Sequence, residues 1–466
     1  MNDAITQPIQ GDGLPLPRRL LAIAAVSFGT ALVVIDGAIA TVALPTIAHD
    51  LKVDGSAAVL VVTVYQLVLV MTLLPFSTLG DRLGHRRLYQ YGQIIFTIAT
   101  ALCFFARSLP FLLVIRAVQA LGAAAALSVS SALVRSIYPS KQLGRGLGVN
   151  SVVVSISAAI APTLGGLILA VGPWPWVFAS AVPFAILSLL IGRALPDPQP
   201  REEPFDVLGA VLCAAMFGLI ITGLESGVHG DSPVISAAIV LTGGFIGYFF
   251  VRRELHEERP IMPVDLLGRP ILALSTIGAF TAFVGSMTLI LTMPFRLQHV
   301  YGFSPGEVGA MIAPWPLTMM FVSPVSGMLS DRYPAGILGG IGMTVAIIAL
   351  LCLAWLPPDP HYFDVAWRMA LCGTGFGLFL SPNSRLVIGT APRERAAAAG
   401  GLISTTRMVG QTLGATLVAA LLALGLGNGP APALVAAALA LVAGLCSVAR
   451  MTPTIRKPEA GLILSE

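Results

Sequence analysis

The chain has 466 residues, of which 56% are hydrophobic and only 11% are charged, and its mean hydropathy is +0.86. A soluble globular chain has roughly 25% charged residues, so this composition excludes that class and indicates a polytopic membrane protein. The formal net charge of +4 does not indicate nucleic-acid binding, because the basic residues are scattered over short segments between apolar runs.

Motifs for metal binding or catalysis are missing from the sequence. All five cysteines fall inside apolar runs with no CxxC pair, and the six histidines lie in or beside predicted loops. There is no HExxH, no Walker A sequence and no GxSxG with plausible partners. We therefore expect no metal, no cofactor and no enzymatic activity, so that energy comes from an ion gradient or from the substrate's own gradient.

Windows of about 20 residues predict fourteen membrane spans. In chain order they lie within residues 20–44, 57–79, 88–106, 109–134, 147–171, 176–195, 206–227, 233–251, 271–294, 306–329, 335–356, 367–388, 397–425 and 431–449. With the N-terminus in the cytoplasm, all but six of the 27 Lys and Arg residues fall in cytoplasmic segments; the exceptions are Lys52, Arg107, Arg296 and Arg368 outside and Arg116 and Arg407 within spans. Because cytoplasmic segments are enriched in basic residues, we expect both termini in the cytoplasm.

The first span contains an ionisable residue, Asp36, within the apolar run Leu20–Leu44 and without a neighbouring cation in the sequence. A carboxylate at that depth costs several kcal/mol unless it is protonated, paired or facing a water-filled cavity. Such a residue marks a proton or substrate path, and a helix-packing hydrogen bond is the alternative.

An internal repeat follows the second span and returns after the tenth. Residues 77–87 read STLGDRLGHRR, and residues 327–336 read GMLSDRYPAG, both at the expected cytoplasmic side. The two places match in a chain of six plus six spans if the seventh and eighth are an insertion. That insertion is flanked by the polar segments 197–206 and 252–265, as linkers would be.

The segment around Asp81 resembles the loop between helices two and three of the major facilitator superfamily, and the whole pattern is similar to its fourteen-helix branch of drug/proton antiporters. Residues 36–45, 116–122 and 157–166 resemble three further motifs of that branch. The sequence departs from these motifs at four positions: Ala38 and Thr41 stand in place of the usual Thr and Asn, and Ser157 and Ala161 replace two glycines.

The resemblance implies an all-α membrane fold of two six-helix bundles plus two inserted central helices. We expect a cytoplasmic N-terminal tail over 1–19, an N-terminal bundle over 20–195, the two extra helices with their linkers over 196–270, a C-terminal bundle over 271–450 and a cytoplasmic tail over 451–466. The resemblance also suggests a functional monomer in the plasma membrane, or the inner membrane of a Gram-negative cell.

Proton coupling is expected at Asp36 and Arg116. Asp36 would face the central cavity, where poor hydration and a nearby positive charge set its affinity for a proton. The resemblance implies that Arg116 supplies this charge, and a structural arginine bound to backbone carbonyls is the alternative.

The substrate cavity has further candidate residues besides Asp36. They are Trp315, Arg407 and Gln411, with Gln298 and Asn383 as weaker candidates. Each of Trp315 and Arg407 could instead be structural.

Two further sets of residues are expected to control conformation. The first set would form a latch that pairs charges across the gap between the bundles. It consists of Asp81, Arg82 and Arg86 and of their repeat at Asp331 and Arg332. A cluster that only sets topology is the alternative. Pro162, Gly165 and Gly166 would let the fifth helix bend and pack closely, sealing the interface between the halves, or would serve ordinary helix packing.

The leading functional expectation is a proton-coupled antiporter that exports amphipathic compounds, preferentially cationic ones, by alternating access. Its partners are a small-molecule substrate, protons and the lipid bilayer, and not nucleic acid. A dedicated exporter of one endogenous metabolite, such as a siderophore or an amino acid, shares these features. A non-transporting membrane receptor or scaffold is the alternative of another class.

Overall fold

The computed structural model describes residues 13–139, 143–196, 206–228, 230, 232–257, 260–391 and 395–451. Within these ranges the regular secondary structure is α-helix with short 3-10 turns, and no strand occurs. The all-α class that the resemblance implies is therefore confirmed.

The first half of the bundle runs from the first helix to the seventh. Its elements are α1 (Leu16–Leu51), α2 (Gly55–Leu83), α3 (His85–Cys103), α4 (Leu109–Ile137), α5 (Leu143–Val171), α6 (Pro175–Ala179), α7 (Val182–Ile191) and the 3-10 turn η2 (Gly192–Ala194). α4 packs against both α2 and α3, while α1 packs against α5.

The second half repeats this arrangement after a short 3-10 turn, η3 (Val264–Gly268). Its helices are α10 (Pro270–His299), α11 (Pro305–Ile312), α12 (Pro314–Leu329), α13 (Ala335–Ala354), α14 (Tyr362–Thr390), α15 (Ala396–Ala423) and α16 (Ala431–Ala449). α14 packs against both α12 and α13, and α10 packs against α15 and α16.

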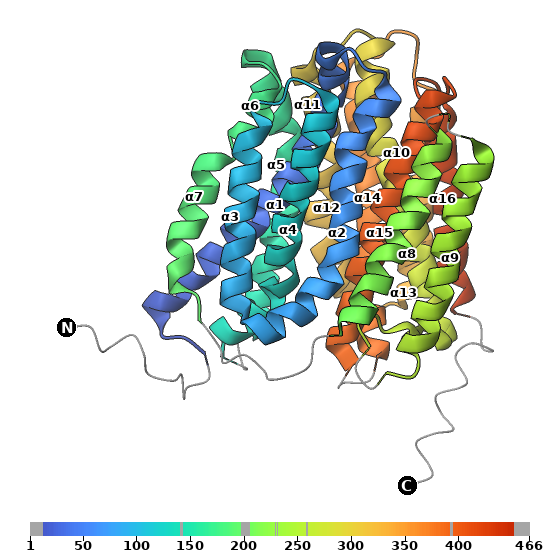
Figure 1. Ribbon diagram of the computed structural model, residues 1–466. Coiled ribbons are helices and arrows are strands. Elements are labelled where there is room, and N and C mark those ends of the chain that lie inside the picture. The colour runs from blue at the N-terminus through green and yellow to red at the C-terminus, as the bar shows by residue number, and fades with distance from the viewer. Residues whose placement is uncertain are drawn as a thin grey trace.

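The two expected inserted helices are α8 (Val207–Val228) and α9 (Pro233–Glu254), which pack against each other. α8 also contacts α2 of the first half and α15 of the second half (Figure 1). Apolar side chains of α8, including Cys213 and Phe217, join a buried cluster with Leu69 of α2 and Met408 of α15. The inserted pair therefore lies along the line where the two halves meet.

Local sequence signals explain where several helices begin and end. Asp54 caps α2 by accepting a hydrogen bond from the backbone N–H of Ala57 at 2.7 Å. Ser304 and Glu307 form a reciprocal capping box at the start of α11. Gly84 separates α2 from α3 with φ at +94°, a backbone conformation that glycine adopts without strain.

Among the described residues, 11 helical segments are long and apolar enough to cross a membrane, so the multi-pass character is confirmed. Two of these segments are interrupted helices, α6 with α7 and α11 with α12. The other three expected spans, 88–106, 147–171 and 367–388, fall on α3, α5 and α14. α3 and α14 carry polar residues, and the apolar helix found within α5 is limited to Ile160–Val171. The total of fourteen therefore stays a prediction.

Candidate functional site

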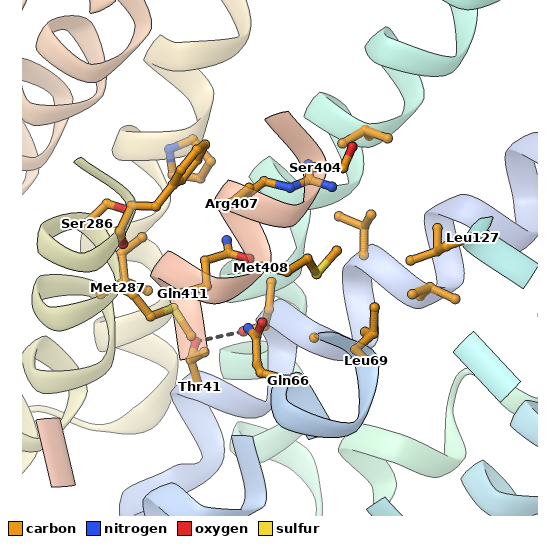
Figure 2. Close-up of a pocket in the computed structure, with 18 of the residues that line it drawn as sticks. Thr41, Gln66, Leu69, Leu127, Ser286, Met287, Ser404, Arg407, Met408 and Gln411 are labelled. Carbon is orange, nitrogen blue, oxygen red and sulfur yellow. Dashed lines mark hydrogen bonds between the residues drawn. The ribbon is translucent and has the colours of Figure 1, made fainter. Parts of the chain in front are cut away.

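A cavity of about 690 Å³ lies between the two halves at the middle of the bundle. Helices α1, α2, α4 and α5 line it from the first half, and α10, α11, α12, α14 and α15 from the second. Figure 2 shows Thr41 and Gln66 of the first half facing the same space as Ser404, Arg407 and Gln411 of α15. Its size suits a drug-sized ligand.

The cavity is closed at one end of the bundle, which we call the distal end; the opposite end, where α1 begins and α16 ends, is the N/C end. A Cβ atom built on Gly166 of α5 would lie 2.7 Å from the carbonyl oxygen of Pro305 in α11. One built on Gly309 of α11 would lie 2.5 Å from the carbonyl oxygen of Pro162 in α5. Only residues without a side chain allow two helix backbones to approach so closely. α5 and α11 therefore form a tight seal between the halves.

Toward the N/C end, by contrast, two buried apolar clusters draw their members from one half each. One cluster surrounds Leu133 of α4, with members from α1 and α3. The other surrounds Leu272 of α10, with members from α14 and α15. The conformation is thus closed distally, with the cavity between the seal and the N/C end.

The structure places three of the expected cavity residues, Trp315, Arg407 and Gln411, in the lining. Trp315 is only 2% exposed, and its ring stacks on that of Phe376 with centroids 5.0 Å apart. Its indole is therefore almost fully covered by protein. Arg407 and Gln411 are partly exposed to the cavity, one helical turn apart on α15.

The expected coupling residues, Asp36 and Arg116, form a buried ion pair between α1 and α4. Arg116 Nη1 donates to Asp36 Oδ2 at 2.6 Å, and Gln119 Nε2 donates to Asp36 Oδ1 at 2.9 Å. Arg116 is fully buried and Asp36 is 2% exposed. Arg116 also donates to the backbone carbonyl of Val61 at 3.3 Å. This contact is of the kind expected if Arg116 is a structural arginine bound to backbone carbonyls.

The expected cavity position of Asp36 differs from its position in this conformation. Gly37, Ala38 and Thr41 of α1 line the cavity, whereas Asp36 and Arg116 do not. The physical reason is the rotation of α1: the side chain of Asp36 projects toward α4, where Arg116 and Gln119 satisfy both carboxylate oxygens. The pairing joins residues 80 positions apart in the chain, so the sequence gives no local signal of it.

Tyr65 of α2 separates the ion pair from the cavity. Its ring lies 4.2 Å from the Arg116 guanidinium, and the residue also belongs to the cavity lining. Its hydroxyl is buried and has no hydrogen-bond partner among the described residues. Sequence reasoning missed Tyr65 and its neighbour Gln66. The signal that could have found them is a pair of polar residues in the middle of an apolar span.

Within the described parts of the chain, the expected latch residues do not pair across the halves. Asp81 Oδ1 lies 3.0 Å from His85 Nε2 within the first half, and Asp331 pairs with Arg385 of α14 within the second half. Arg82 and Arg332 are exposed, and Arg86 is partly exposed. The halves make their tight contact at the distal end, so the latch segments at the N/C end contact their own half in this conformation.

The partner of Asp331, Arg385, is a permanent cation. Its guanidinium also donates to the Gly327 carbonyl at 2.7 Å. The hydrogen bond from Arg385 holds the pKa of Asp331 below its ordinary value. This carboxylate is therefore charged throughout the physiological range.

Pro162, Gly165 and Gly166 lie where α5 meets both halves. Pro162 and Gly166 face α11, as described above, while a Cβ atom on Gly165 would lie 2.9 Å from the side chain of Ile39 in α1. The close packing expected of this motif is therefore present. The weaker cavity candidate Asn383 is instead bound to Arg450 and to the backbone of Ser275.

The fold and the cavity define a membrane transporter built from two helical bundles. A model of the Major Facilitator Superfamily matches residues 26–415, and the chain belongs to this family.

Named relatives and a solved structure agree with this assignment. The chain is 42% identical to the uncharacterized transporter YebQ of Escherichia coli K12 over 448 residues, covering 95% of this chain and 98% of that protein. It is 30% identical to the multidrug resistance protein Stp of Mycobacterium tuberculosis (strain CDC 1551 / Oshkosh) over 416 residues, covering 87% and 76%. Its fold is similar to an inward-facing, unoccupied crystal structure of a bacterial homologue of the human lysosomal transporter Spinster, with a TM-score of 0.67, 18% identity and coverage of 93% and 98%.

Proposed function

We propose that this transporter exports amphipathic small molecules in exchange for protons by alternating access. The observation that carries the proposal is the central cavity, closed distally, with an ionisable pair directly behind its wall. Rocking of two repeated halves around a midplane cavity is the mechanism expected of such folds. The multidrug resistance protein Stp, similar over most of the chain, supports the export of foreign compounds.

Proton exchange is assigned to Asp36 because its charge and its position are tied to Arg116. A proton on Asp36 would cancel the charge that Arg116 contacts, and leaving one member of a buried ion pair alone costs about 3–5 kcal/mol. Protonation and this packing of α1 against α4 therefore exclude each other. A proton that binds Asp36 would shift the equilibrium toward a different arrangement of the helices.

One proton is sufficient for useful export. A proton that moves down 100 mV provides about 2.3 kcal/mol, and a tenfold concentration gradient of a neutral substrate requires about 1.4 kcal/mol. Tyr65 covers the ion pair on its cavity side. A movement of this ring would connect substrate binding in the cavity to the proton site behind it.

The preference for cationic substrates loses its structural basis in this conformation. It depended on Asp36 facing the cavity, whereas the charged side chain among the described lining residues is Arg407. We therefore propose amphipathic substrates without that preference. The lining is mostly apolar, which favours loose recognition over a dedicated exporter of one metabolite.

Transport by purified protein in proteoliposomes with an imposed pH gradient tests the proposal. Wild-type protein should accumulate amphipathic dyes against their gradient, and Asp36→Asn should abolish this accumulation while still exchanging dye across the membrane without a gradient. The matched control is Asp50→Asn, which changes an exposed carboxylate at the end of α1. Uphill accumulation by Asp36→Asn with normal pH dependence would falsify the assignment of the coupling site.

A further inference from the structure

Arg407, which is partly exposed to the cavity, differs from the buried arginines of the membrane region. Arg116 pairs with Asp36, Arg296 donates to the carbonyls of Leu353 and Ala354, and Arg450 donates to three side chains. No hydrogen bond or ion pair joins the Arg407 guanidinium to another described residue.

The described lining also offers Arg407 no counter-charge, because no aspartate or glutamate is part of it. A cation in a largely apolar cavity inside the membrane costs several kcal/mol unless a partner satisfies it. Intramembrane charges of this kind face a cavity or a pathway and mark a functional site. The missing partner of Arg407 is therefore expected to come from the ligand.

The surroundings of Arg407 fit an acidic group. Ser404 lies one turn before it and Gln411 one turn after it on the cavity face of α15, so neutral hydrogen-bonding groups flank the guanidinium (Figure 2). A planar guanidinium donates two parallel hydrogen bonds to a carboxylate and also pairs with its negative charge, an attraction that a neutral or cationic ligand lacks.

Most of the remaining lining is apolar and suits the body of the ligand rather than a second charge. Phe283, Met287, Met319 and Met408 line the cavity together with the stacked pair that includes Phe376. Methionine and aromatic side chains adapt to ligands of different shape. The site therefore combines one anchoring cation with an adaptable apolar surface.

We propose that Arg407 binds the carboxylate of the substrate and that the preferred substrates are amphipathic organic acids. This inference rests on the proposed export function and adds the chemical class of its substrate. It reverses the charge expected from the sequence, because the charge exposed to the cavity belongs to Arg407 and not to Asp36.

A matched series of fluorescent probes tests this charge preference. Dansylglycine carries a carboxylate, dansylglycinamide is its neutral analogue, and dansylcadaverine is a cation. Their binding to purified protein is measured by fluorescence in nanodiscs of phosphatidylcholine, so that no anionic lipid competes. We expect dansylglycine to bind about tenfold more tightly than the amide, since a charge-assisted bidentate contact is worth roughly 1.4 kcal/mol or more.

Variants then assign this preference to Arg407. Arg407→Gln should bind the acid and the amide equally, and Arg407→Lys should restore part of the preference. Unchanged binding of the amide shows that each variant is folded. Arg385→Gln removes an arginine outside the cavity and should keep the full preference. Equal binding of acid and amide by the wild-type protein, tighter binding of dansylcadaverine, or a preference that survives in Arg407→Gln would each overturn the inference.

Transport of the same probes separates this inference from the proposed function. Proteoliposomes that accumulate acid and amide equally would retain the exporter and reject the role of Arg407. Preferential binding of the acid without uphill accumulation of any probe would retain the role of Arg407 and reject proton-coupled export.

Discussion

At the scale of single residues, the pair of Asp36 and Arg116 is the most consequential contact in the first half. Both side chains are buried, so each depends on the other for its stabilisation. Arg116→Gln should lower the thermal stability strongly, because an uncompensated buried carboxylate costs about 3–5 kcal/mol. Arg116→Gln combined with Asp36→Asn should recover most of this loss, because two neutral amides replace the ion pair.

Thermal unfolding of the purified protein in detergent measures this coupling, with Asp36→Asn as the second single variant. A double variant that is as unstable as the sum of the two single ones would show that the residues act independently.

The hydroxyl of Tyr65 provides a second residue-scale prediction. This hydroxyl is buried, and no described residue hydrogen-bonds to it. Tyr65→Phe should therefore leave the protein as stable as the wild type or stabilise it, while the ring contact with Arg116 is kept. Tyr89 is the matched control, because its buried hydroxyl donates to the carbonyl of Ala25 at 2.8 Å. Tyr89→Phe should destabilise by about 1 kcal/mol or more. Unfolding midpoints that rank the two variants in the opposite order would contradict this account.

At the scale of helices, the contact of α5 with α11 holds the distal end closed. Gly166→Ala places a methyl group 2.7 Å from the carbonyl oxygen of Pro305, closer than van der Waals contact allows, so it should disfavour this conformation. A maleimide added from the distal side should then react faster with a cysteine introduced at Thr41, in the cavity wall.

Gly244→Ala is the control for this experiment, because a Cβ atom there meets nothing within 4 Å. Labelling rates that are equal in Gly166→Ala and Gly244→Ala would mean that the close approach of α5 and α11 does not control access.

The start of α8 is tied to the end of α9 by Asp206, which accepts hydrogen bonds from Arg253 at 2.6 Å and from the backbone N–H of Gly209 at 2.9 Å. Partial burial raises the pKa of Asp206, but these two hydrogen bonds outweigh it, and the pKa is lowered. Because the folded pKa lies below the unfolded one, the stabilisation is present above about pH 4 and is lost as the pH falls through the folded value.

Asp206→Ala should therefore lower the unfolding midpoint at pH 7, and the difference from the wild type should shrink at pH 3, where the wild type has begun to lose the same contact. A difference that stays constant between pH 7 and pH 3 would show that the loss comes from helix capping alone.

At the scale of the whole molecule, the sequence predicts the architecture better than it predicts the site. Hydropathy and the repeat around Asp81 and Asp331 were sufficient to predict helical spans in two related halves. They could not predict that Asp36 projects toward Arg116, because the rotation of a helix about its axis depends on packing across 80 residues of chain. The position of α8 against both α2 and α15 is a tertiary contact of the same kind.

The two halves are expected to move relative to each other during transport. The distal seal and the separate clusters at the N/C end belong to one conformation, and alternating access requires a second in which the distal end opens. Asp36→Asn removes the charged partner of Arg116 and should shift the equilibrium toward the second conformation, in which the distal end is open. A shift in the populations of the two conformations from 1:99 to 99:1 requires about 5.5 kcal/mol. Breaking one buried ion pair costs slightly less, so we expect a mixture of both conformations.

Spin labels on α4 and α14 report both ends at once. One pair replaces Ser108 and Phe363 at the distal end, and the other replaces Arg135 and Ile388 at the N/C end, all of them exposed. In nanodiscs, Asp36→Asn should lengthen distances in the distal pair and shorten them in the N/C pair, whereas Asp50→Asn should leave both unchanged. When two rigid halves rock, the distance at one end lengthens as the distance at the other end shortens. Distances that change in the same direction at both ends would therefore indicate loosening of the bundle.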